Sequence, residues 1–187
     1  MTSALVEMTS TYLVERTLRH SETGGVYVAR HESSGRQVLL KEAHDAAESI
    51  RRLSRERATL EALADLDCVP RLLEHRLDWE HLWLAREYVP GATLAEAVID
   101  RHPLTRAGAT PADLDRYAAW ATDVLSKVET ALSQVWARGV RLAEVDPHSV
   151  VLRPDGRVAL VNLARDDGWG DRHSLRALRL WVFFPLT

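Results

Sequence analysis

Short strand-like runs and a long amphipathic segment follow one another at the start of this chain, and their order restricts the fold more than any single motif. Three runs rich in Val, Leu and Tyr come first, separated by polar and glycine-containing turns, at residues 12–18, 25–31 and 37–42. They predict three consecutive antiparallel strands. Between residues 45 and 66, apolar residues from Ile50 to Leu63 recur at helical spacing among Arg and Glu, which predicts a long amphipathic helix.

Two more strand-like runs follow this helix, and most of the second half of the chain is then predicted to be helical. The runs lie at residues 71–77 and 82–87. Thr93 is the expected N-cap of a short helix that ends near Ile99, and Thr110 opens a long helix that stops before Gly139. The pattern closes with a hairpin over residues 150–161 and a helix over residues 171–184.

This order predicts an α+β chain with two lobes. A five-stranded antiparallel sheet with one long helix forms the first lobe, and a mostly helical second lobe follows it. The strand pattern breaks at residues 88–91, which contain a Pro and a Gly, so the connection between the lobes is expected there. The predicted divisions are an N-terminal segment at residues 1–11, a first lobe at 12–88 and a second lobe at 89–187.

The composition argues against several classes of partner. The net charge is -3, with 24 Lys and Arg against 27 Asp and Glu, so no overall attraction to nucleic acid or to an anionic membrane is expected. The N-terminus lacks a basic segment followed by an apolar run, and the apolar stretch at residues 175–186 contains Arg176 and Arg179. Neither export nor a membrane span is therefore predicted. Cys68 is expected to be a small core residue in a cytoplasmic protein.

Several stretches within this framework resemble the protein-kinase fold. They are T-G-G-V-Y-V-A-R at 23–30, L-L-K-E-A at 39–43, L-A-R-E-Y-V-P-G-A-T-L at 84–94, and A-R-G-V at 137–140 with R-L-A-E-V-D-P-H-S-V-V-L directly after it. With the closing D-R-H-S-L-R-A-L-R-L-W-V-F-F-P-L-T, they are similar, more narrowly, to the kinase domain of class III and class IV lanthipeptide synthetases. The resemblance covers residues 12–187 and implies a kinase-like N-lobe and a kinase-like C-lobe.

The resemblance also implies a biochemical setting. In that family the kinase phosphorylates Ser and Thr residues of a precursor peptide, and a lyase domain then eliminates the phosphate. No lyase segment precedes the matched residues in this sequence, and no cyclase segment follows them. We therefore expect the chain to act with a partner enzyme and a precursor or leader peptide in ribosomal peptide modification.

The resemblance assigns nucleotide-binding positions in the first lobe. Lys41 and Glu56 match the kinase pair in which a strand Lys, held by a helix Glu, contacts the phosphates; the alternative is a surface Lys beside a solvated helix face. Gly24 and Gly25 belong either to a phosphate lid that keeps only its last glycine or to an ordinary hairpin turn. Arg86 is expected either to fill the site or to turn toward a carboxylate. The expected cofactor-binding set is Gly24, Gly25, Val26, Lys41, Glu56, Glu87 and Val89, the last two through their backbone.

The expected catalytic loop is substituted at the positions that act on the substrate and the metal. Glu144 stands in place of the base Asp, Ser149 in place of the metal-binding Asn, and Asn162 in place of the metal-binding Asp. Asp146 is the candidate for a displaced base or metal ligand. Because Mg²⁺ prefers charged or carbonyl oxygens, these changes predict that no cofactor is required, with ATP and Mg²⁺ as the alternative.

Three hypotheses follow from these losses. The first is a pseudokinase-like binding or accessory module that is inactive alone. The second is a weak or atypical ATP-dependent Ser/Thr phosphotransferase, and the third is a truncated or decayed product. The short stretch between Leu163 and Asp171, where kinases carry a longer activation segment, favours the first. The apolar last helix predicts packing against the long helix or docking onto another chain, including a second copy.

Overall fold

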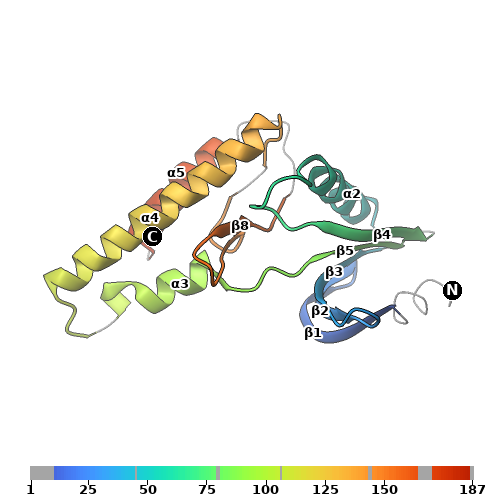
Figure 1. Ribbon diagram of the computed structural model, residues 1–187, viewed down its shortest axis with the longest axis horizontal. Helices are drawn as coiled ribbons and strands as arrows, with labels where there is room; N and C mark the ends of the chain where they lie inside the picture. Colours follow the sequence, from blue (N-terminus) through green and yellow to red (C-terminus); the bar gives the residue numbers. More distant parts are fainter. Residues whose placement is uncertain are drawn as a thin grey trace. The chain divides into compact units, whose positions relative to one another are not determined.

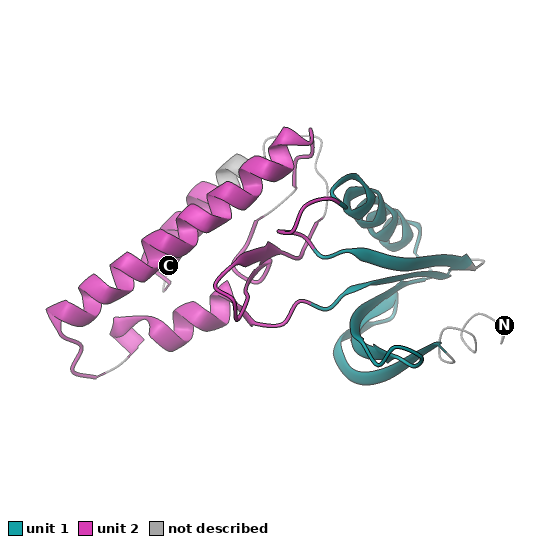
Figure 2. Cartoon of the chain, in the orientation of Figure 1, with its two compact units in different colours: residues 1–64, 70–88 teal, residues 65–69, 89–187 magenta. Residues whose placement is uncertain are grey.

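The computed structural model describes residues 11–44, 46–78, 81–105, 107–142, 145–163 and 170–185. The chain divides into two compact units (Figure 2). Unit 1 comprises residues 1–64 and 70–88, and unit 2 comprises residues 65–69 and 89–187. Each unit is described below by itself.

Unit 1 is built on a five-stranded antiparallel sheet (Figure 1). The strands are β1 (Tyr12–Ser21), β2 (Gly24–His31), β3 (Gln37–Ala43), β4 (Leu72–Asp78) and β5 (His81–Glu87). They pair in the order β1-β2-β3-β5-β4, so that β1 and β4 form the two edges. The prediction of an α+β chain with a five-stranded antiparallel sheet is confirmed. The order of the strands was not predicted, because β5 reaches β3 across the intervening helix and β4.

A hydrogen bond links the two edge strands of this sheet. The hydroxyl of Tyr12 on β1 donates to Oε2 of Glu74 on β4 at 2.7 Å, and burial is the main cause that raises the pKa of Tyr12. The sheet therefore curls until one end of β1 reaches β4. One face of the sheet encloses a core cluster of Tyr12, Ala29, Val38, Leu40, Trp83 and Ala85. The curl allows the sheet to bury this face largely with its own residues.

Helix α2 (Ala47–Ala62) packs against β3, β4 and β5 in unit 1. Leu53 and Leu60 are buried on its inner side, and Leu63 at its C-cap is fully buried. The helix is shorter than the predicted range of 45–66. Its N-cap, Ala46, has no side chain able to accept a hydrogen bond from the first turn, and residues 63–65 form a turn.

Unit 2 contains three α-helices and a small sheet in its described residues. The helices are α3 (Leu94–Arg101), α4 (Pro111–Ala137) and α5 (Gly170–Phe183), with a short 3₁₀ helix at Pro103–Thr105. Thr93 and Thr110 cap α3 and α4 in capping boxes with Glu96 and Asp113, as the N-cap prediction required. The small sheet consists of β6 (Ala92–Thr93), β7 (Val150–Leu152) and β8 (Val158–Leu160).

Hydrogen bonds to the backbone tie the helices of unit 2 together. The buried Tyr117 hydroxyl on α4 donates to the carbonyl of Val182 on α5 at 2.5 Å. Cys68 is buried, as expected, and its carbonyl accepts from the amide of Leu160 on β8 at 2.8 Å. The last helix therefore packs against the long helix through both Tyr117 and apolar side chains such as Leu178 and Val182, which are almost fully buried. Among the described residues, no helix is long and apolar enough to span a membrane.

Candidate functional site

A buried ion pair joins β3 to α2 in unit 1. Nζ of Lys41 lies 2.6 Å from each carboxylate oxygen of Glu56. The side chains are 16% and 8% exposed, so the pair is largely removed from water. Side chains alternate along a strand, which places Lys41 on the face of β3 opposite the buried Val38 and Leu40. That face meets α2, and the pair is therefore a tertiary contact rather than a surface ion pair.

Arg86 on β5 is the third charged residue of this group. Its Nε lies 3.7 Å from Oε1 of Glu56, and its Nη1 donates to the carbonyl of Glu87 at 3.3 Å. The Arg86 side chain is 6% exposed. Of the two orientations that the sequence left open, the structure has the one in which Arg86 turns toward a carboxylate. Two cations therefore share Glu56.

Burial sets the protonation behaviour of both cations. It lowers the pKa of Lys41; the negative charge of Glu56 opposes this shift, and the positive charge of Arg86 adds to it. Burial also lowers the pKa of Arg86, with Glu56 and Glu87 opposing the shift. A guanidinium nevertheless stays charged in proteins. Glu56 is thus the carboxylate on which this buried group depends.

The glycines of the first hairpin are surrounded by protein atoms. Gly24 has a φ of +149°, and a Cβ built there would lie 2.1 Å from the carbonyl oxygen of Glu42. A Cβ on Gly25 would lie 2.1 Å from the hydroxyl of Tyr27. Val26 pairs with Lys41 across the β2–β3 ladder. Close approach to the backbone of β3 therefore accounts for Gly24, whereas the atoms nearest Gly25 belong to the end of the Tyr27 side chain.

Glu87 and Val89, the expected hinge residues, have different surroundings. The amide of Glu87 donates to the carbonyl of Arg71 at 2.8 Å, and its carbonyl accepts from Arg86. Val89 belongs to unit 2, where it packs with Val151 and Ala159 in a small apolar cluster. The carbonyl of Glu87, one of the backbone groups expected to face adenine, therefore already accepts a hydrogen bond from the side chain of Arg86.

The candidate loop residues of unit 2 form a local turn. Oδ1 of Asp146 accepts from the amides of His148 and Ser149 at 2.7 and 2.8 Å. Ser149 is buried, and its carbonyl accepts from the amide of Val161 at 2.8 Å, which places Ser149 beside the strand end that leads to Asn162. Glu144, the expected base, lies outside the described residues.

The donor atoms near this turn do not suit a magnesium ion. Ser149 and Asn162 contribute only neutral oxygens, and one oxygen of Asp146 already accepts two amides. Mg²⁺ is a hard cation that is usually held by carboxylates together with phosphates. Within the described part of the chain, no three His, Cys, Asp or Glu side chains are placed to hold a metal ion.

Comparisons with known proteins add one relative. No protein-family model matches the chain. A protein of Streptomyces coelicolor, named Probable SapB synthase, is 36% identical over 206 residues, which cover 94% of this chain and 22% of the relative. The chain therefore spans about a fifth of the length of this curated relative, and the matched region includes most of both units.

Proposed function

We propose that the chain is a pseudokinase-like binding or accessory module that acts with a partner enzyme in lanthipeptide-type modification of a ribosomal peptide. The observation that carries this proposal is the buried group of Lys41, Glu56 and Arg86. The Lys–Glu pair is the part of the kinase machinery that the sequence retains. Arg86 adds a second cation to the same carboxylate and occupies the carbonyl of Glu87.

The biological setting rests on two similarities of the sequence. The motifs between residues 23 and 187 resemble the kinase domain of lanthipeptide synthetases, and the relative from Streptomyces coelicolor is named for the synthesis of SapB. The match covers 22% of that relative, so the similarity concerns one part of such a synthase. A precursor peptide and a partner biosynthetic enzyme are accordingly the proposed partners.

The accessory role is favoured over catalysis by the surroundings of the loop residues. Asp146 is engaged in a turn through Oδ1, and Ser149 is buried with its backbone paired to Val161. These contacts give both residues a structural role that requires neither substrate nor metal. Asn162 lacks the negative charge that balances a metal between phosphates.

The experiment that tests the proposal is a phosphate-transfer assay on a synthetic peptide that contains several Ser and Thr residues, with radiolabelled ATP and Mg²⁺. The wild-type chain is expected to transfer no phosphate above the level of Lys41→Met. Addition of the partner enzyme is expected to give modification that depends on the chain, and Lys41→Met is expected to preserve that dependence. Transfer by the wild-type chain alone, abolished in Lys41→Met, would overturn the proposal.

The retained Lys41–Glu56 pair supports one alternative, a weak ATP-dependent Ser/Thr phosphotransferase that acts on the precursor peptide with Glu144 as base. This function requires magnesium-dependent nucleotide binding. Calorimetric titration with ATP, with and without Mg²⁺, separates the two proposals. Binding that needs Mg²⁺ and strengthens in Asn162→Asp favours the enzyme, whereas no heat of binding under either condition favours the accessory module.

A further inference from the structure

Strand β1 presents a long free edge on unit 1. It lies at the end of the strand order and pairs with β2 on one side only, within the described residues. Nine of its ten residues, all but Tyr12, are exposed. The backbone groups on the outer side of such a strand can pair with an added strand, which is how several binding domains take up extended peptides.

Apolar side chains on β1 are also exposed. Leu13 is 60% exposed and Leu18 is 48% exposed, and Val14 is 44% exposed. These exposures are high for branched apolar residues on a strand, which usually pack against a neighbouring strand or helix. An added strand would cover part of this surface while it pairs with the backbone.

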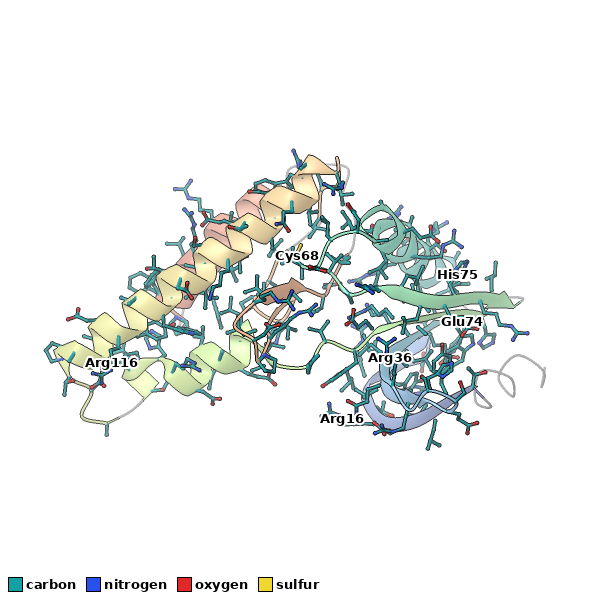
Figure 3. The ribbon with its side chains drawn as sticks, in the orientation of Figure 1. Arg16, Arg36, Cys68, Glu74, His75 and Arg116 are labelled. Carbon is teal, nitrogen blue, oxygen red and sulfur yellow. The ribbon has the colours of Figure 1, made fainter. Side chains whose placement is uncertain are left out.

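The charged side chains of β1 differ in whether a described residue pairs with them. Glu15 accepts hydrogen bonds from Arg30 Nε at 2.6 Å and from Gln37 Nε2 at 2.8 Å. Arg16 and Arg19 are exposed and make no ion pair with any described residue. Figure 3 labels Arg16 on this strand and Arg36 just before β3, another exposed arginine of unit 1. The β1 edge therefore carries positive charge that no ion pair with a described residue neutralises.

Two irregularities in the ladder shape this edge. The pairing of β1 with β2 skips Glu15 and Leu18, which are the extra residues of two bulges. Bulges and edge arginines are devices that prevent a strand from pairing with its own copy. If two copies paired through β1, the arginines of both strands would come together, and like charges on paired strands are destabilising. An acidic strand would meet the same arginines favourably.

We propose that the outer edge of β1 binds an acidic, extended peptide segment by strand addition, with Arg16 and Arg19 selecting its charge and Leu13 and Leu18 contacting its apolar residues. The inference deepens the proposed function and rests on it only for the identity of the natural ligand, which would be the precursor peptide. The binding itself requires neither nucleotide nor metal. Bulges shorten the continuous ladder, so charge contributes a large share of the affinity.

The test uses a fluorescein-labelled peptide of about ten residues that alternates Glu and Val, a length suited to one strand. Fluorescence anisotropy with the full wild-type chain is expected to show saturable binding that weakens at least about tenfold between about 0.05 M and 0.5 M sodium chloride. The double variant Arg16→Glu, Arg19→Glu is expected to weaken binding at least about tenfold at low salt. Arg116→Glu, which replaces an exposed arginine of unit 2 (Figure 3), is the matched control and is expected to leave binding unchanged.

A second probe separates strand addition from simple charge attraction. A peptide with the same side chains on an N-methylated backbone cannot donate backbone hydrogen bonds, so it is expected to bind at least about tenfold more weakly. Equal binding of the two peptides, or equal binding by the double variant and the wild type, would overturn the proposal. Absence of wild-type binding would overturn it as well.

Two further measurements keep these outcomes interpretable. Thermal melts by circular dichroism establish that each variant is folded, and the milder pair Arg16→Gln, Arg19→Gln replaces the double variant if its melt is altered. Because the anisotropy assay contains no ATP and no partner enzyme, its failure leaves the phosphate-transfer result untouched. Conversely, phosphate transfer by the chain alone would overturn the accessory role without affecting peptide binding at β1.

Discussion

The charged residues that the kinase resemblance singles out are held in two different ways in the two units. In unit 1, Lys41, Glu56 and Arg86 come from three elements and meet in a buried group. In unit 2, Asp146 hydrogen-bonds to backbone amides two and three residues further along the chain. The first group depends on tertiary packing of β3, α2 and β5, whereas the second is a local turn. Loss of one residue should therefore have very different consequences in the two units.

The largest expected effect comes from Glu56→Ala. The change leaves two buried cations without their shared carboxylate, and loss of one partner of a buried ion pair typically costs about 3–5 kcal/mol. Urea denaturation followed by circular dichroism measures this loss. Glu61→Ala is the matched control on the same helix, because the Glu61 side chain is 47% exposed and its ion-pair partner among the described residues is the half-buried Arg57. If Glu61→Ala lost as much stability as Glu56→Ala, the special role of the buried ion group would be refuted.

Lys41→Met is expected to cost less stability, about 1–2 kcal/mol, because Glu56 keeps Arg86 at ion-pair distance and the new side chain is apolar.

The burial that lowers the pKa of Lys41 also makes the stability of the wild-type chain depend on pH. Below its ordinary value of 10.5, the unfolded chain binds the proton more tightly than the folded chain, so wild-type stability rises with pH toward that value. Urea midpoints measured between pH 7 and pH 10 should rise less in Lys41→Met. If Lys41→Met lost as much stability as Glu56→Ala, Arg86 would not be compensating the charge of Glu56.

Asp146→Ala tests the contribution of the local turn in unit 2. The variant removes an acceptor of two backbone amides, which should cost about 1 kcal/mol. Asp146→Asn keeps an oxygen acceptor and should retain most of this stability. Thermal unfolding of both variants, beside the exposed turn residue change Asp155→Ala, provides the measurement. Equal effects of the Ala and Asn substitutions would argue that the charge of Asp146, rather than its turn, is what matters.

An effect at neutral pH as small as that of Asp146→Ala is expected from Tyr117→Phe in unit 2. It removes the hydrogen bond to Val182, at a cost of about 1 kcal/mol. Burial raises the pKa of Tyr117 from 10.0 to about 12. Above pH 10 the unfolded chain loses this proton while the folded chain keeps it, so wild-type stability falls between pH 10 and about 12. The stability of Tyr117→Phe should fall less over the same pH range. If its stability fell as steeply as that of the wild type, Tyr117 would not be the group responsible.

Several parts of the molecule could be predicted from the sequence because their cause is local. Thr93 and Thr110 stand before helical patterns with an acidic residue three positions later, and both form capping boxes. The strands of unit 1 were located to within about three residues, since alternation and turn residues mark them directly. The two-residue strand β6 was missed because so short a segment has no periodicity to detect.

The candidate site was harder to predict from the sequence than the strands and caps. The separation of Lys41 and Glu56 indicated a strand–helix pair, but nothing in the sequence decided which way Arg86 would turn. The packing around Gly24 and Gly25 could not be predicted either, because it comes from Glu42 on the paired strand β3 and from the side chain of Tyr27 on β2 itself. Their pattern left both a phosphate lid and a hairpin turn open, and it favoured the turn.

Local sequence patterns were enough to predict the order of strands and helices, the caps of α3 and α4, and the distribution of charged residues along the chain. The strand order of the sheet, the contact between Tyr12 and Glu74, and the sharing of Glu56 by two cations became known from the folded chain. These two groups of features differ in how far apart in sequence the contacting residues lie. Periodicity and capping arise among residues a few positions apart. A curled sheet and a buried ion group arise from contacts between residues distant in sequence, and a local sequence pattern does not indicate the free energy of those contacts.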